Sequence, residues 1–131
     1  MTIASNILVV ASDLETQQGV AVALGRCGWA PILACSVDEA IGIVNRFPVS
    51  LAFCSDELQQ AAVDKFIKHA SQPLNKIPVV VVSRLDDWKR YVEYLGAGAF
   101  AYVLHSPNGE EIERLARAVL SASNAQSSSA N

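Results

Sequence analysis

Short apolar runs separated by helix-like segments constrain the fold of this chain more than any other feature of its sequence. The runs over residues 7–11, 50–54 and 79–82 are almost entirely apolar and do not alternate between polar and apolar positions. Strands of this kind are buried on both faces, as in parallel sheets that helices cover. The sequence therefore predicts an α/β domain.

Strand-like and helix-like segments alternate five times along the chain. Two shorter strands are expected over residues 31–35 and 101–104, and the intervals between strands are long enough for helical crossovers. Helices are expected over residues 14–27, between Ser36 and Pro48, and over residues 57–69, 86–95 and 110–121. Asp13 is expected to cap the first of them, and the Ser-x-x-Glu spacing of Ser36 and Glu39 predicts a capping box at the start of the second. This alternation predicts a parallel sheet with helices on both faces.

Size and charge narrow the class of protein further. The 131 residues suffice for one domain with a sizeable core. A net charge of -3 and a pI near 5.3 give no positive field that would attract nucleic acid, so direct binding of nucleic acid is not expected. The sequence contains neither a long apolar span nor a signal peptide. We therefore expect a cytoplasmic protein that does not contact the membrane.

The end of the chain and the cysteines add two smaller predictions. Residues 123–131 are polar and rich in serine, so we expect a domain over residues 1–122 followed by a flexible tail or the stub of a linker. The spacing of Cys27, Cys35 and Cys54 does not suit a zinc site, and we expect buried, reduced thiols. Cys54 lies beside the candidate site described below and is kept as a candidate redox group.

Four segments of the chain form a set that points to one family. They are residues 7–10, 50–54 and 77–83, and the Ala97-Gly98-Ala99 turn with the strand that follows it up to His105. Together they resemble the receiver (CheY-like) domain of two-component response regulators, over about residues 6–122. The resemblance implies a flavodoxin-like fold, a doubly wound parallel sheet of five strands in the order 2-1-3-4-5. It also implies a role in phosphorelay signal transduction.

The resemblance further implies a phosphorylation pocket at the carboxyl ends of the strands. In receiver domains, two acidic residues after the first strand hold Mg²⁺ and an aspartate after the third accepts the phosphoryl group. A Thr or Ser after the fourth strand and a lysine after the fifth bind that group. Aligned without gaps, these positions hold Ala11, Ser12, Ser55, Ser83 and His105, of which only Ser83 is an accepted type. Without carboxylates and lysine the pocket is degenerate, and we expect neither an enzyme nor a cofactor.

Two alternatives remain open. A shift of one residue at the strand ends would bring Asp13 into the metal position and Asp56 into the acceptor position, and would make Mg²⁺ a cofactor. The strand cores and Ser83 fit the unshifted register, and neither register supplies a lysine. A second alternative is a domain that binds a small molecule in the crevice that has lost its charges.

The predicted fourth helix and fifth strand carry a group of aromatic residues. Trp88, Tyr91 and Tyr94 lie with Arg90 on the helix, and Tyr102 matches the aromatic residue that changes rotamer during signalling in receiver domains. Aromatic residues and arginine are enriched in interface hot spots. The 3.6-residue period spreads the helical aromatics over an arc too broad for all to be buried. We therefore expect a phosphorylation-independent regulatory module that binds a protein partner or a second copy of itself through the fourth helix, fifth strand and fifth helix.

Overall fold

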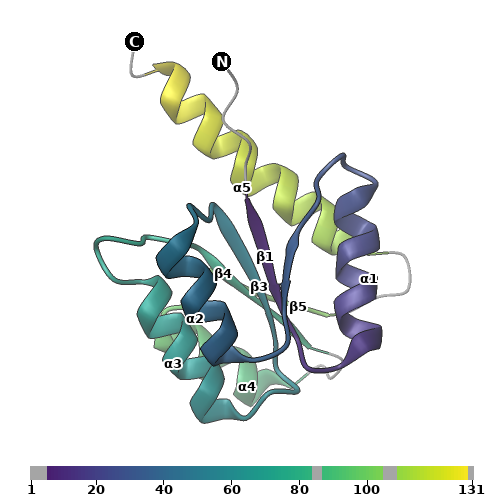
Figure 1. Ribbon diagram of the computed structural model, residues 1–131, viewed down its shortest axis with the longest axis vertical. Helices are drawn as coiled ribbons and strands as arrows, with labels where there is room; N and C mark the ends of the chain where they lie inside the picture. The colour runs from purple at the N-terminus through teal and green to yellow at the C-terminus, as the bar shows by residue number, and fades with distance from the viewer. Residues whose placement is uncertain (1–5, 84–86, 105–108, 130–131) are drawn as a thin grey trace.

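The computed structural model describes residues 6–83, 87–104 and 109–129, with the backbone alone described from residue 121 onward. Within these ranges, parallel strands form one sheet in the order β2-β1-β3-β4-β5 (Figure 1). The strands are β1 (Ile7–Val10), β2 (Ile32–Ala34), β3 (Leu51–Ser55), β4 (Val79–Ser83) and β5 (Ala101–Leu104). The helices are α1 (Leu14–Gly25), α2 (Val37–Arg46), α3 (Gln60–Ala70), α4 (Trp88–Ala97) and α5 (Glu110–Ser129). The predicted fold class and strand order are confirmed.

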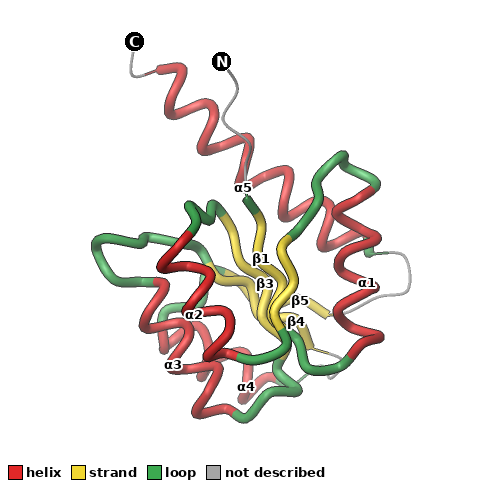
Figure 2. The backbone as a smooth tube through the Cα atoms, in the orientation of Figure 1, coloured by secondary structure: helices red, strands yellow, loops and turns green. Residues whose placement is uncertain are grey.

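Helices cover both faces of the sheet, and the sheet separates the core into two layers (Figure 2). Helices α1 and α5 cover one face, where Val9, Phe53 and Val80 are buried. Helices α2, α3 and α4 cover the other face, where Val10 and Val81 are buried. Every residue of β1, β3 and β4 is buried, which explains why these strands show no polar alternation in the sequence.

The helix starts agree with the sequence where a cap was predicted. Asp13 caps α1, and the Ser36 hydroxyl accepts a hydrogen bond from the Glu39 amide at 3.1 Å at the start of α2. The capping box differs in one detail, because the Glu39 carboxylate accepts from the amide of Cys35, at 3.0 Å, and not from the amide of the cap residue. Helix α1 ends at Gly25, two residues before the predicted end.

The region after β3 departs from the prediction. The strand extends to Ser55, and α3 begins at Gln60 instead of Glu57. The Ser55 hydroxyl accepts a hydrogen bond from the Glu57 amide at 3.2 Å, so the chain turns here before the helix begins. Local side-chain to backbone bonds of this kind compete with helix formation. The predicted helix start at residue 57 is wrong for that reason.

Helix α5 is longer than predicted. The apolar face ends near Leu120, but the helical backbone continues to Ser129 and extends past the end of the sheet (Figure 1). Residues 121–129 contain neither glycine nor proline, so no residue breaks the helix. The helix end predicted at residue 121 is wrong. The domain boundary at residue 122 and the tail or linker after it stay predictions.

The cysteines differ from one another in burial. Cys54 is buried as expected, whereas Cys27 is partly buried and Cys35 is exposed. The expectation of buried thiols is wrong for Cys35, because it follows β2, a strand at the edge of the sheet. Among the described residues, no helix has the length and apolar character needed to span a membrane.

Candidate functional site

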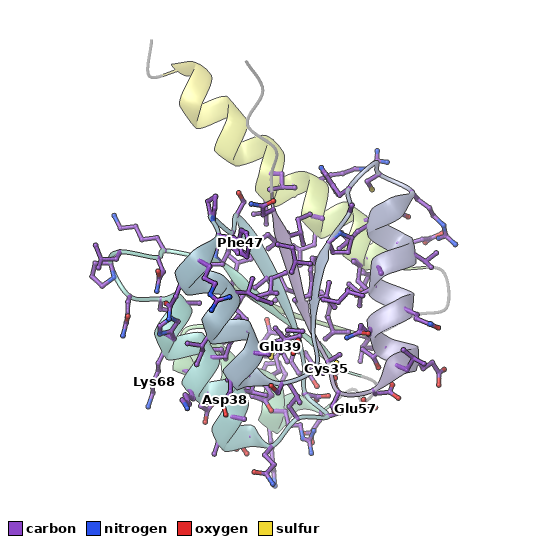
Figure 3. All side chains as sticks on the ribbon, viewed as in Figure 1. Cys35, Asp38, Glu39, Phe47, Glu57 and Lys68 are labelled. Carbon is purple, nitrogen blue, oxygen red and sulfur yellow. The ribbon has the colours of Figure 1, made fainter. Side chains whose placement is uncertain are left out.

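The carboxyl end of β3 places Ser55 and Asp56 in different layers of the domain. Ser55 is the last residue of the strand and lies opposite Val82 of β4, and the amide of Asp56 continues the ladder by donating to the Val82 carbonyl at 3.0 Å. Because side chains alternate along a strand, Ser55 belongs to the layer of Phe53 and Asp56 to the layer of Cys54. Glu57 and Cys35 lie at this same end of the sheet, opposite Phe47 (Figure 3).

Asp56 forms a charged contact at this edge. Its side chain is 4% exposed, and Nη1 of Arg90, whose side chain is 42% exposed, donates to its Oδ2 at 3.1 Å. Arg90 lies in the first turn of α4, and its Nε is 3.7 Å from the carboxylate of Asp87, the cap of that helix. Arg90 was predicted as an interface residue and Asp56 as a pocket residue. The structure joins them, although they are 34 positions apart in the sequence.

The charge of Asp56 affects its buried neighbours. Burial, followed by the Asp56 charge, raises the pKa of the Cys54 thiol to about 12. The same two causes raise the pKa of Tyr94 to about 12. The hydrogen bond to Asp56 also raises the pKa of the Arg90 guanidinium. A thiol that stays protonated is a poor nucleophile, so this environment argues against Cys54 as a redox group.

The carboxyl end of β1 presents few metal ligands. Ala11 is buried, and Ser12 is exposed. Oδ2 of Asp13 accepts hydrogen bonds from the amide of Thr16 at 3.0 Å and from its hydroxyl at 2.8 Å, as expected for a helix cap. Within the described ranges, no three His, Cys, Asp or Glu side chains are grouped so that they could hold a metal ion. The structure thus places Asp13 in a capping role.

The remaining pocket positions are described in part. Ser83 is buried as the last residue of β4 and lies opposite Leu104 of β5. It follows Val81 by two positions and therefore belongs to the same layer as Asp56. His105 lies outside the described residues.

One polar residue of this edge was missed at the sequence level. The buried side chain of Gln17 donates to the carbonyl of Ala11 at 3.4 Å and to that of Ala34 at 3.5 Å. It thereby bridges the ends of β1 and β2. A glutamine within a helical pattern carries no signal that distinguishes this role from a solvent-exposed position.

The aromatic residues of α4 and β5 form a continuous row. Trp88 stacks on Tyr91 with ring centroids 5.2 Å apart, and Tyr91 meets Tyr102 edge to face at 5.8 Å. Tyr102 in turn lies 6.2 Å from Tyr94. Trp88 is 72% exposed and Tyr94 is 2% exposed, which confirms that the helical aromatics do not all face inward. We call these four side chains the aromatic row. The switch role of Tyr102 stays a prediction.

The architecture is that of response-regulator receiver domains, as comparison with solved structures shows. A response regulator from Thermotoga maritima matches with a TM-score of 0.80 and 21% identity, covering 91% of this chain and 99% of that one. The receiver domain of a putative Luxo repressor protein from Vibrio parahaemolyticus matches with a TM-score of 0.83 and 11% identity, covering 95% and 96%.

A third match lies within a longer protein. NtrX from Brucella abortus matches with a TM-score of 0.79 and 23% identity, over 98% of this chain and 29% of that one. No protein-family model and no curated protein matches the sequence. At these identities the likeness establishes the receiver fold, and the function must be argued from this chain's own residues.

Proposed function

We propose that this chain is an atypical receiver domain that regulates a protein partner, or a second copy of itself, without being phosphorylated and without acting as an enzyme. The observation that carries this proposal is the ion pair between Asp56 and Arg90. The pair engages the carboxylate that follows β3 and links it to the helix that carries the exposed aromatic residues.

The chemistry at the strand ends supports the first part of the proposal. Phosphoryl transfer depends on positioning and on neutralising charge on the transferred oxygens. The Ala11 side chain offers no metal ligand, and the buried hydroxyl of Ser55 accepts a bond from the Glu57 amide. A serine hydroxyl without an adjacent base is a weak nucleophile. Arg90 binds Oδ2 of Asp56, so phosphorylation at that oxygen would require Arg90 to release it.

The surface over α4, β5 and α5 supports the second part. Trp88 and Tyr91 expose stacked rings, and Val92, Phe100 and Leu104 are also exposed. Beside them a groove of about 380 Å³ lies between β5 and α5, lined by Tyr102, Val103, Glu111, Arg114, Leu115 and Ala118. A surface with exposed aromatic anchors and polar groups at its edge is typical of protein interfaces.

Two measurements test the absence of phosphorylation. We expect no chemical-shift change at Asp56 or its neighbours on titration with millimolar Mg²⁺, and no label from acetyl phosphate. Asp56→Asn is the matched control, because it removes the acceptor of the shifted register. Stoichiometric base-labile label that this substitution abolishes would instead establish a phosphoacceptor domain that uses Asp56, with Asp13 as the metal ligand.

Measurements of self-association test the proposed interface over α4, β5 and α5. Sedimentation velocity would measure self-association, and retention on immobilised wild-type domain would detect the same contact in a second format. An alanine at a true hot spot costs about 2 kcal/mol or more, roughly thirtyfold in affinity. We expect Trp88→Ala with Tyr91→Ala to weaken association by that factor. Phe47→Ala, at the opposite end of the sheet (Figure 3), should leave it unchanged. Equal effects of both changes would exclude this surface.

A further inference from the structure

We propose that the Asp56–Arg90 ion pair is a latch that fixes helix α4 against the end of the sheet and thereby sets the position of the aromatic row. The inference about α4 stands on the geometry alone. Its consequence for partner binding rests on the proposed function.

Helix α4 has few other anchors. Tyr94 is its only buried residue, and Leu95 and Ala97 pack partly buried against the same layer, whereas α3 buries Val63, Phe66, Ile67 and Ala70. A hydrogen bond from Gln60 to Glu93 at 2.6 Å joins the two helices at an exposed position. Elements with few buried apolar contacts open locally at a low free-energy cost. The position of α4 should therefore be sensitive to a single polar contact.

The ion pair lies where it can hold this helix. Arg90 is four positions before the buried Tyr94 and one before Tyr91, which stacks on Trp88. The pair thus connects the buried end of β3 to the first turn of α4, beside the exposed part of the aromatic row. The Asp87 cap accepts hydrogen bonds from the amides of Lys89 and Arg90, so it stabilises the turn itself and does not join it to the sheet.

The unequal burial of the two partners gives the latch a distinctive signature. Asp56 is 4% exposed, so removal of Arg90 leaves a buried carboxylate with no other counter-ion among the residues that the structure describes. Arg90 is 42% exposed, so removal of the Asp56 charge leaves a guanidinium that water can solvate. A buried charge that loses its partner costs much more than an exposed one. Removal of both charges should therefore be milder than removal of Arg90 alone.

Amide hydrogen exchange measured by NMR on the full chain tests the latch. The variants are Asp56→Asn, Arg90→Gln and the two combined. Lys89→Gln is the control, because it removes the same charge from an exposed neighbour in the same helix. Amides of α3 serve as an internal reference.

Loss of the ion pair should make α4 amides exchange about threefold faster in Asp56→Asn, in line with a partly exposed pair. The unpaired carboxylate should raise the acceleration to about tenfold or more in Arg90→Gln. The combined variant should return to the Asp56→Asn level, and Lys89→Gln should match the wild type.

Wild-type exchange in both variants that carry Asp56→Asn would overturn the latch. This test of the latch remains valid even where Arg90→Gln alone does not fold, because neither of the two variants with Asp56→Asn contains a buried charge at position 56. A combined variant that exchanges as fast as Arg90→Gln would also overturn it. If α4 loosens while Trp88→Ala with Tyr91→Ala leaves association unchanged, the latch stands and the proposed interface fails.

Discussion

Replacing Phe53 by alanine tests whether β3 is the centre of the sheet. Phe53 is buried and lies between Val9 of β1 and Val80 of β4, in the layer that α1 and α5 cover. Truncation of a buried phenylalanine costs about 3–5 kcal/mol, from lost transfer free energy and from the cavity left behind. A domain of this size has a total stability of about 5–15 kcal/mol. Phe53→Ala should therefore remove a large share of it.

Urea unfolding followed by circular dichroism measures this loss. With a slope of about 2 kcal/mol per molar urea, a cost of about 4 kcal/mol lowers the midpoint by about 2 M. Phe47→Ala is the matched control, because the same atoms are removed from a side chain that is half exposed. Its midpoint should change by less than about 0.5 M. Equal midpoints for the two variants would refute the assignment of β3 as the central strand.

Two further predictions concern pH and glycine positions. Because the folded-state pKa values of Cys54 and Tyr94 are about 12, above their ordinary values of 9.0 and 10.0, the unfolded chain loses these protons first. The contribution of these groups to the free energy of unfolding should be level below pH 9 and fall above it, by about 1.4 kcal/mol at pH 10 for the thiol alone. Urea unfolding at several pH values should show a shallower fall for Cys54→Ala. Gly109 has φ +66, and a Cβ there would lie 2.6 Å from the Cβ of Ala23, so Gly109→Ala should lower the free energy of unfolding by about 2 kcal/mol or more. Gly42 lies inside α2, and an added Cβ there would meet no atom within 4 Å. Gly42→Ala should therefore raise the free energy of unfolding by about 1 kcal/mol, and calorimetry should show melting shifts of opposite sign for Gly42→Ala and Gly109→Ala.

The sequence by itself determined the order and type of the elements. Unbroken apolar runs marked β1, β3 and β4, because burial on both faces of a parallel sheet leaves no polar position. The bounds of β5 were predicted to the residue, and the Asp13 and Ser36 caps formed as expected. These features depend on neighbours within a few positions, and a local pattern can therefore reveal them.

Tertiary structure decided which side chains of the candidate site are in contact. The sequence assigned Asp56 to a pocket and Arg90 to a surface, and only the packing of α4 beside the end of β3 brought the two charges to 3.1 Å. It also decided that Tyr94 is buried while Trp88 is exposed, since helical periodicity gives the angle between side chains but not the direction of the core. Contacts between elements distant in the chain depend on sheet order and helix placement, which no local pattern contains.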